Sequence, residues 1–301
     1  MHTAIKSLFM VWAALCAAGL QAQVIFACEP EWAALARVLL PQARIHVATT
    51  HLQDPHHIEA RPALIAQLRA ADLAVCTGAG LEEGWFGVLQ QRSGNPKVQS
   101  GQAGLFWATD GQVLLGQRTA SGSPFEGDVH PQGNPHLHAN PKRLLQVAEA
   151  MAQRMGQLWP EQALEIDTRS REFQHRWQTH IQQWTARAQT LKGRRVVAQH
   201  SHFAYLWEWL GCSQVADLEP KPGLSPTPAH LQQTVQRLRD LHPGPLGVAV
   251  ASHQDPRAAR WVGQQLPSLA IWVWPATVSE VNEQGLLSWF EGLLQDLLKR
   301  S

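Results

Sequence analysis

The sequence predicts an α/β protein with two similar lobes, each built on a parallel sheet flanked by helices, and one long rigid helix that joins the lobes. Two features of the 301 residues predict this class. Short apolar runs alternate with helical patterns in both halves of the chain, as is typical of parallel sheets covered by helices. Between the halves, residues 160–192 contain no glycine and no interior proline.

The composition excludes several classes of protein. Lys and Arg number 25 against 24 Asp and Glu, so the formal net charge is +1 and there is no electrostatic reason to expect a nucleic acid or an anionic membrane as partner. With 45% hydrophobic residues the chain can bury a sizeable core. The 15 histidines are the unusual feature, because histidine is the side chain most used to bind transition metals.

Residues 1–22 have the layout of a secretory signal peptide. Lys6 precedes an apolar run at residues 8–20, and small side chains lead to a cleavage site that we expect after Ala22. The run is shorter than the roughly 20 residues that cross a bilayer, and no later segment has the pattern of a membrane span. We therefore expect an exported protein whose mature fold starts at residue 23.

The first lobe is predicted to span residues 23–159. Its strand candidates are residues 24–28, 45–49 and 73–76, and helical patterns lie between them. Its last helix begins at Pro141, because Asn140 is a favourable N-cap and proline suits the first helical position. The turn-rich residues 116–135 are expected to form a long surface loop of the kind that carries function.

Residues 160–192 are predicted to form one connecting helix. Apolar side chains recur there every three or four residues, which gives the helix one apolar face. Up to about 30 residues make an element of roughly 45 Å, long enough to be a rigid connector. The alternative is two shorter helices with a break near Asp167.

The second lobe is predicted to span residues 193–301. Its strand candidates are residues 195–199, 214–218, 247–251 and 269–274, again separated by helical patterns. The alternation therefore resumes after the connecting helix, and a second parallel sheet is expected.

Three cysteines remain after removal of the signal peptide, namely Cys28, Cys76 and Cys212. No pair has the C-x-x-C spacing of a thiolate metal site. Cys28 and Cys76 each end a strand candidate, and the first and third strands of such sheets are often neighbours. An exported protein permits a disulfide between them, and two buried thiols are an equally weighted alternative.

Three groups of histidines fall in loops at the ends of predicted elements. The first group is at residues 54–57, after the second strand; the second is at 134–138, ahead of the helix at Pro141; the third is at 200–202, directly after a strand. In open α/β sheets the ligand crevice lies beyond the carboxyl ends of the strands. The three groups can therefore converge in the cleft between the lobes.

Such a convergence favours a metal site. Neutral imidazoles are borderline ligands suited to zinc, and three of them at about 2.0–2.1 Å leave one tetrahedral position for a carboxylate or a water. A zinc hydrolase would share this arrangement, but the sequence has no H-E-x-x-H motif and no G-x-S-x-G elbow. No strong general base stands beside the histidine groups, Glu59 being the nearest carboxylate. We therefore interpret the chain as a binding protein and not as an enzyme.

Three segments resemble the metal-ligand motifs of a known family. They are DPHHIEARP at residues 54–62, GNPHLHANP at 133–141 and VVAQHSHFAYLWEWLG at 196–211. In matching order along the whole mature chain, they resemble the motifs of the ZnuA/TroA-like (cluster A-I) solute-binding proteins of zinc and manganese ABC transporters. The resemblance implies two α/β lobes joined by a rigid helix, with one metal ion bound in the cleft and passed to a membrane permease.

The resemblance also implies the ligands. They fall on His56, His136 and His200. Their neighbours are His57, His138 and His202, which are then supporting partners or transient acceptors of the metal.

Two departures from the family pattern concern the remaining ligands. The family often supplies an acidic fourth ligand from the loop after the last strand, where Glu280 is the candidate in this chain and a bound water is an equal alternative. Zinc-specific members often carry a long His-rich loop in the first lobe. Within residues 116–135 the candidate ligands are Asp128 and His130, so a reduced accessory role is expected, with His130 as a possible helper.

The ligand set indicates the metal. In this family manganese goes with two histidines and two carboxylates, and His200 stands where a manganese binder would have a Glu, so we expect Zn²⁺ as the cargo. The alternatives are a manganese-binding protein or an adhesin-like surface protein of the same fold. We expect a periplasmic monomer whose partners are the permease of a zinc ABC transporter and, as a second candidate, a periplasmic metallochaperone.

Overall fold

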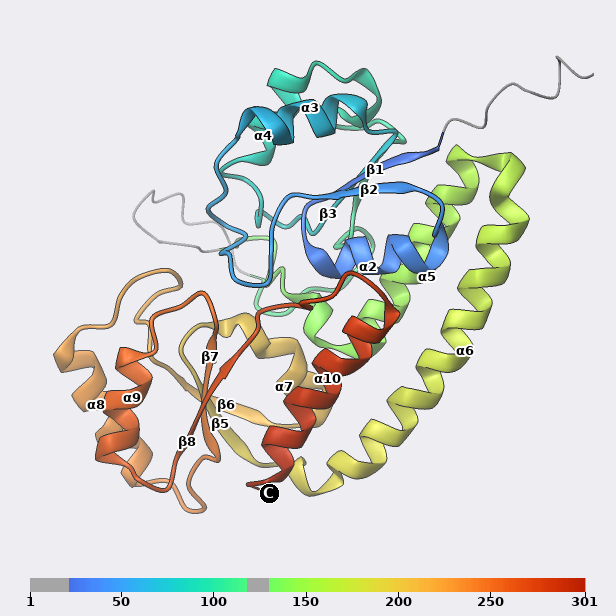
Figure 1. The fold of residues 1–301 in the computed structure, drawn as a ribbon. Coiled ribbons are helices and arrows are strands. Elements are labelled where there is room, and N and C mark those ends of the chain that lie inside the picture. Colours follow the sequence, from blue (N-terminus) through green and yellow to red (C-terminus); the bar gives the residue numbers. More distant parts are fainter. Residues whose placement is uncertain (1–21, 118–129, 301) are drawn as a thin grey trace, which may run out of the picture.

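The computed structural model describes residues 22–117 and 130–300 (Figure 1). The strands of its first lobe are β1 (Val24–Ala27), β2 (Arg44–Val47), β3 (Leu73–Cys76) and β4 (Leu105–Trp107). The helices of this lobe are α2 (Pro30–Leu39), α3 (Pro62–Ala70), α4 (Phe86–Ser93) and α5 (Pro141–Leu158). The predicted signal peptide, apart from Ala22, and residues 118–129 of the predicted loop lie outside the described residues.

Helix α6 (Ala163–Arg187) follows the first lobe. The strands of the second lobe are β5 (Arg195–Ala198), β6 (Ser213–Asp217), β7 (Gly247–Ala251) and β8 (Ala270–Trp274). The helices of this lobe are α7 (Ala204–Leu210), α8 (Pro228–Arg239), α9 (Arg257–Gln265) and α10 (Glu283–Leu298).

The two sheets have the same topology. Their strand orders are β2-β1-β3-β4 and β6-β5-β7-β8, and every neighbouring pair is parallel. The predicted fold class is therefore confirmed. Strand β4 is missing from the sequence prediction, because its three residues are too few to show an apolar run.

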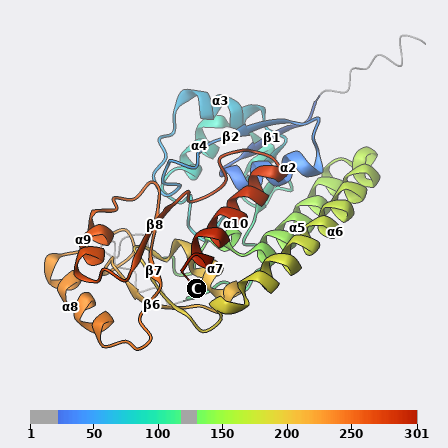
Figure 2. The ribbon, with the colours of Figure 1, turned by 60° about the horizontal axis from the view of Figure 1, so that its bottom comes forward.

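Helix α6 is continuous through Asp167, where the alternative prediction placed a break. Short 3₁₀ segments at Pro160–Gln162 and Ala188–Leu191 adjoin its two ends. It runs beside α5 and along the side of the molecule from one lobe to the other (Figures 1 and 2). The prediction of one long helix over residues 160–192 thus differs from the structure only at the ends. The central 25 residues are α-helical, and short 3₁₀ segments replace the predicted α-helix on either side.

The inner faces of the two sheets share one hydrophobic core. Alternate strand residues such as Ile25 and Val75 in the first lobe and Val196 and Ala249 in the second pack with α2, α5, α6, α7 and α10 in a single cluster. The outer faces have separate cores, under α3 and α4 in one lobe and under α8 and α9 in the other. Successive side chains of a strand point to opposite faces of the sheet. One face of each sheet therefore contributes to the shared core, and the other face contributes to a core within its own lobe.

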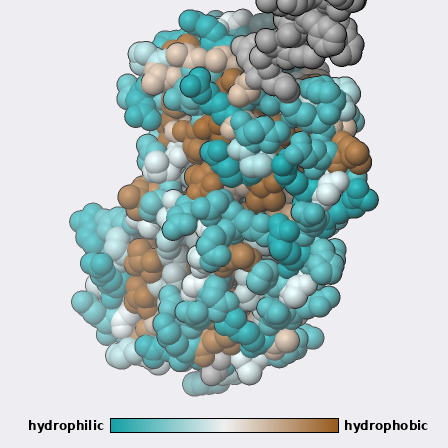
Figure 3. Space-filling model, turned by 45° about the vertical axis from the view of Figure 1, so that its right-hand side comes forward, coloured by the Kyte–Doolittle hydropathy of each residue, from teal (hydrophilic) through white to brown (hydrophobic). Residues whose placement is uncertain are grey.

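The outer surface of α6 is solvated. Phe173, Trp177 and Trp184 on its inner face are buried, whereas charged side chains such as Arg171 are exposed. The side of the molecule that Figure 3 brings forward is mostly hydrophilic, with isolated hydrophobic side chains. Within residues 22–117 and 130–300, no helix combines the length and the apolar character needed to span a membrane.

Cys28 and Cys76 form a disulfide, which decides between the two predicted alternatives. The bond lies at the carboxyl ends of β1 and β3, which are neighbouring strands as expected. Both cysteines are fully buried beneath α3 and α4. Cys212 is the free cysteine of the described residues.

Removing this disulfide should destabilise the first lobe. The bridged residues are 48 positions apart, and closing a loop of that length lowers the entropy of the unfolded chain enough to stabilise the fold by about 4 kcal/mol. We predict that the double variant Cys28→Ala, Cys76→Ala loses roughly 2–4 kcal/mol of unfolding free energy in urea titrations. Cys212→Ala is the control and should change it by less; equal losses in both proteins would contradict the prediction.

Candidate metal centre

The three predicted ligands come together where the two lobes meet. His56 lies in the loop after β2, His136 in the loop before α5, and His200 directly after β5. One nitrogen of each ring lies within 4.8 Å of a nitrogen of the other two. The ring centroids are 5.6–6.0 Å apart, and the ring planes cross at 69–82°, so the nitrogens converge and the faces do not stack.

The first two ligand motifs contain the same turn. The side-chain Oδ1 of Asp54 accepts the backbone N–H of His56 at 3.0 Å, and the Oδ1 of Asn134 accepts the N–H of His136 at 2.9 Å. In both motifs a proline fixes φ between the two residues. The D-P-H and N-P-H sequences therefore hold the ligand backbone by one local hydrogen bond each.

Two of the ligand rings are supported by carboxylates. His56 Nδ1 lies 2.7 Å from Asp54 Oδ1, and His200 Nδ1 lies 2.9 Å from Glu219 Oε2, which also accepts the N–H of Gly223 at 2.8 Å. With the proton on Nδ1, the Nε2 lone pair of each ring is available to a metal. Burial acts to raise the pKa of Asp54, but the hydrogen bonds from His56 outweigh it and hold that pKa well below its usual range.

His136 has no such support. Its side chain is 1% exposed, and among the described residues neither ring nitrogen has a hydrogen-bonding partner. Burial, followed by the neighbouring histidines, lowers its pKa well below 6.5, so the ring is neutral. A buried polar group without a partner costs about 1–3 kcal/mol, which a metal ion bound to the ring would offset.

His138 and His202 lie on the inner side of the three rings. The Nε2 atoms of both donate to the carbonyl oxygen of Ala276, at 3.0 and 2.8 Å. His138 Nδ1 is also 3.2 Å from Glu31 Oε1, and Glu31 accepts the hydroxyl of Thr277. Both histidines and Glu31 of α2 therefore bond to the loop after β8, whereas His138 Nδ1 forms no hydrogen bond among the described residues.

His130 stands beside His56 in the structure. Its Nε2 lies 3.1 Å from His56 Nε2, and the two rings stack with centroids 5.2 Å apart. Its Nδ1 is 3.1 Å from the carbonyl oxygen of Ala79, which only a protonated Nδ1 can use as a partner. In that tautomer the Nε2 of His130 has a lone pair directed toward the site.

The remaining candidates differ in position. His57 is exposed and, with His56, borders a cavity of about 650 Å³. Glu280, the predicted acidic ligand, is exposed in the loop before α10 and does not line the cavities at the three rings. The loop instead turns Ala276 and Thr277 inward, so the structure gives no support to Glu280 as a ligand.

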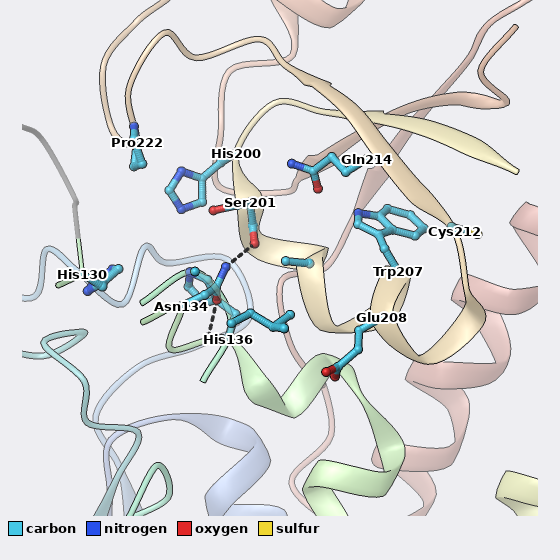
Figure 4. Close-up of a pocket in the computed structure, with 13 residues that line it drawn as sticks. His130, Asn134, His136, His200, Ser201, Trp207, Glu208, Cys212, Gln214 and Pro222 are labelled. Carbon is cyan, nitrogen blue, oxygen red and sulfur yellow. Dashed lines mark hydrogen bonds between the residues drawn. The ribbon is translucent and has the colours of Figure 1, made fainter. Parts of the chain in front are cut away.

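Two roomy cavities adjoin the three rings in the described structure, besides one of about 10 Å³ at His136. One, of about 430 Å³, is bordered by His130, His136 and His200, with Trp207 on its opposite side (Figure 4). The other, of about 650 Å³, is bordered by His56, His57 and His200 and by acidic side chains. The rings therefore lie between a mostly apolar cavity and a cavity with a larger polar share.

His253 and Glu219 are site residues that the motifs do not indicate. His253 follows β7 by two residues and borders the larger cavity, as Glu219 does after β6. The rule that selects His200, a polar residue just beyond the carboxyl end of a parallel strand, applies to both. The same rule could therefore have identified His253 from the sequence.

The fold and the buried cluster of imidazoles between the lobes define a metal-binding solute-binding protein. The chain belongs to the family described as "ZnuA: Zinc-uptake complex component A periplasmic", whose model matches residues 25–299. This is a family of periplasmic metal-binding proteins.

Different proteins that are similar to this chain are associated with different metals. The high-affinity zinc uptake system protein ZnuA of Yersinia pestis is 22% identical over 191 residues, which span 60% of this chain and 60% of that relative. A crystal structure of ZnuA superposes with a TM-score of 0.77 at 18% identity, covering 93% of this chain and 99% of the other. The solute-binding protein FpvC from Pseudomonas aeruginosa in complex with Mn²⁺ gives 0.76 at 16% identity, covering 92% and 98%.

A laminin-binding protein also shares the fold. That protein of Streptococcus agalactiae, described as bifunctional with adhesin and metal-transporting activity, gives a TM-score of 0.73 at 16% identity and covers 93% of this chain and 99% of the other. The fold is therefore common to proteins described with different functions, and the choice of metal depends on this chain's own ligands.

The neutral, buried histidines make the stability of the metal-free protein depend on pH. Burial lowers the pKa of His202, as of His136, well below the ordinary 6.5. In the unfolded chain such rings titrate near 6.5, so below that pH the unfolded state binds protons that the folded state does not. The unfolding free energy due to these rings therefore falls as the pH falls.

We predict that His202→Asn weakens this dependence in the metal-free protein by up to about 1.4 kcal/mol per pH unit between about pH 5 and 6.5. Urea unfolding of both proteins measures it. Burial raises the pKa of Glu82 to about 7, so this carboxyl group increases the unfolding free energy as the pH falls in this range. Because Glu82 is present in both proteins, the difference between their unfolding free energies isolates the contribution of His202. His175→Asn, at an exposed position, should keep the wild-type dependence; parallel curves for His202→Asn and wild type would contradict the assignment.

Proposed function

We propose that this protein binds Zn²⁺ in the periplasm and delivers it to the membrane permease of a zinc ABC transporter. The observation that carries the proposal is the burial of His136 inside a cluster of three imidazoles, where neither of its ring nitrogens has a hydrogen-bonding partner among residues 22–117 and 130–300. Neutral imidazoles suit zinc, whereas manganese prefers carboxylate and other oxygen ligands. The family description and the zinc uptake relative of Yersinia pestis support the same cargo.

We propose His130 as the fourth ligand. Four nitrogens about 2.0–2.1 Å from a tetrahedral zinc ion lie about 3.3 Å from one another. The Nε2 atoms of His130 and His56 are already 3.1 Å apart, close to this spacing. His130 thereby takes the position for which Glu280 and a bound water are the candidates from the sequence.

Manganese is the second candidate cargo, because FpvC was solved in complex with Mn²⁺. The carboxylates near the site of this chain contact ring nitrogens, Asp54 through His56 and Glu219 through His200. They therefore support the imidazoles and are not placed as direct ligands. This arrangement favours zinc over manganese.

Loss of the three imidazoles should abolish metal capture. We predict that the variant with His56→Ala, His136→Ala and His200→Ala retains no zinc after dialysis, as measured by elemental analysis, whereas the wild type retains one ion. His136→Ala alone should weaken binding by more than about 100-fold, the upper range for residues that only support a ligand. His230→Ala, on the surface of the second lobe, is the control. Calorimetry that shows tight binding of manganese but not of zinc would overturn the choice of metal.

His130 offers a separate test of the coordination. We predict that His130→Ala weakens zinc binding by about 10–100-fold, because a water replaces one imidazole while three ligands remain. Competition with a chelator measures the change. An unchanged affinity would assign the fourth position to a water.

A further inference from the structure

Tyr205 is the only tyrosine of the chain, and it lies in the third ligand motif without being a ligand. It belongs to α7 of the second lobe, and its side chain is fully buried. The phenol oxygen accepts the backbone N–H of Leu115 at 3.0 Å and donates its proton to the carbonyl oxygen of Asn134 at 2.8 Å. One hydroxyl of the second lobe therefore bonds to two backbone segments of the first.

These two backbone segments also pair with each other. The N–H of Asn134 donates to the carbonyl oxygen of Leu115 at 2.7 Å. In an antiparallel pair the reverse bond would run directly from the Leu115 N–H to the Asn134 carbonyl. Here the phenol oxygen of Tyr205 stands between these two groups and bonds to both. The hydroxyl therefore sets how far apart the two segments lie.

The phenol ring is itself held in place. The guanidinium of Arg143 lies over it, 5.4 Å from the ring centroid, and bonds to Glu208 of α7 at 2.9 Å and to the carbonyl oxygen of Val113 at 2.7 Å. Burial raises the pKa of Tyr205, although the Leu115 N–H and Arg143 act in the opposite direction. The hydroxyl therefore keeps its proton at neutral pH and remains a donor.

Asn134 connects this hydroxyl to the metal centre. Its Oδ1 accepts the N–H of His136 and its Nδ2 donates to the carbonyl oxygen of Ser201, at 2.9 and 2.8 Å (Figure 4). On its other side, the N–H of Gly133 bonds to the carbonyl oxygen of His130 at 3.0 Å and closes a turn. A displacement of the Asn134 backbone would therefore move the segments that carry His136 and His130.

We propose that Tyr205 is a positioning residue of the metal centre. Its hydroxyl holds the backbone of Asn134 at the place from which His136 and His130 reach the ion, so it acts through Asn134 and not as a ligand. The inference rests on the proposed function, because it takes both histidines as zinc ligands. It assigns to a residue of the second lobe the placement of two ligands of the first.

His136 depends on such control more than the other predicted ligands do. Carboxylates orient the rings of His56 and His200, whereas neither ring nitrogen of His136 has a hydrogen-bonding partner among the described residues. The approach of the His136 ring to the ion is therefore set by the backbone that precedes it. Tyr205 provides through that backbone what the carboxylates provide by direct contact with the other rings.

Loss of the hydroxyl has a defined consequence. In Tyr205→Phe the buried ring remains, but the N–H of Leu115 and the carbonyl of Asn134 lose their shared partner. Buried backbone groups are nearly always paired in proteins, so we expect these two groups to bond directly to each other. Asn134 then moves toward Leu115, and the coordination geometry at the ion changes.

The test compares the wild type with Tyr205→Phe and, as a matched control, Arg176→Gln. Arg176 is an exposed residue of α6 that also makes two hydrogen bonds to another element, both to Glu283 of α10. Competition with a chelator gives the zinc affinity, the visible absorption bands of the Co²⁺-loaded protein report the coordination geometry, and urea unfolding of the metal-free protein gives the stability. We expect Tyr205→Phe to raise the zinc dissociation constant about tenfold and to change the Co²⁺ bands. Arg176→Gln should match the wild type in both.

Two results would overturn the positioning role. Zinc affinity and Co²⁺ bands equal to those of the wild type would show that the hydroxyl does not control the ligands. A lower unfolding free energy with unchanged Co²⁺ bands would make Tyr205 a support of the fold alone. Either result would leave the proposed function standing as long as the wild type binds zinc. Failure of the wild type to bind zinc would instead refute the proposed function.

Discussion

The site depends on one constraint, which is the burial of the His136 ring without a hydrogen-bonding partner in the described part of the chain. Nothing polar in the described structure fixes this ring, so its position is set by the backbone that carries it. Asn134 provides that control: its Oδ1 accepts the N–H of His136, and its Nδ2 donates to the carbonyl of Ser201, next to His200. Tyr205 adds a hydroxyl bond to the carbonyl of Asn134. One asparagine thereby ties the ligand loops of both lobes together.

The same constraint explains why the lobes share a core. If the lobes moved apart freely, the rings from the two lobes would separate and His136 would lose its enclosure. The indole N–H of Trp177 on α6 donates to the carbonyl of Pro141, just after the second ligand motif, and Arg187 pairs with Glu291 of α10 through two hydrogen bonds. Many of the 13 tryptophans lie in this shared core. Metal binding should therefore order the site more than it reshapes the molecule.

The sequence predicts those parts of the site that follow from backbone rules. The carboxyl ends of parallel strands meet at one edge of their sheet, so residues 54–57 and residues 200–202 could each be placed at the ligand-binding edge of their own lobe from strand positions. Side-chain direction within a loop has no such rule. The loop after β8 exposes Glu280 and directs the carbonyl of Ala276 inward, and no pattern in its sequence indicates this choice. His130 approaches His56 through tertiary packing, which spacing along the chain does not reveal.

The net charge of +1 is compatible with holding a divalent cation because the compensating charge is local. Asp54 and Glu219 place two carboxylates behind two of the ligand rings, and together they balance the charge of one divalent ion. Both carboxylates contact the Nδ1 atom of a ligand ring. The ion is therefore coordinated by imidazole nitrogens, and carboxylates that do not touch it balance its charge. Direct carboxylate ligands would neutralise the charge equally well, but they would also favour harder ions such as manganese. In this chain, imidazoles coordinate the ion and carboxylates behind them balance its charge. The site therefore favours zinc and is electrically close to neutral when the ion is bound.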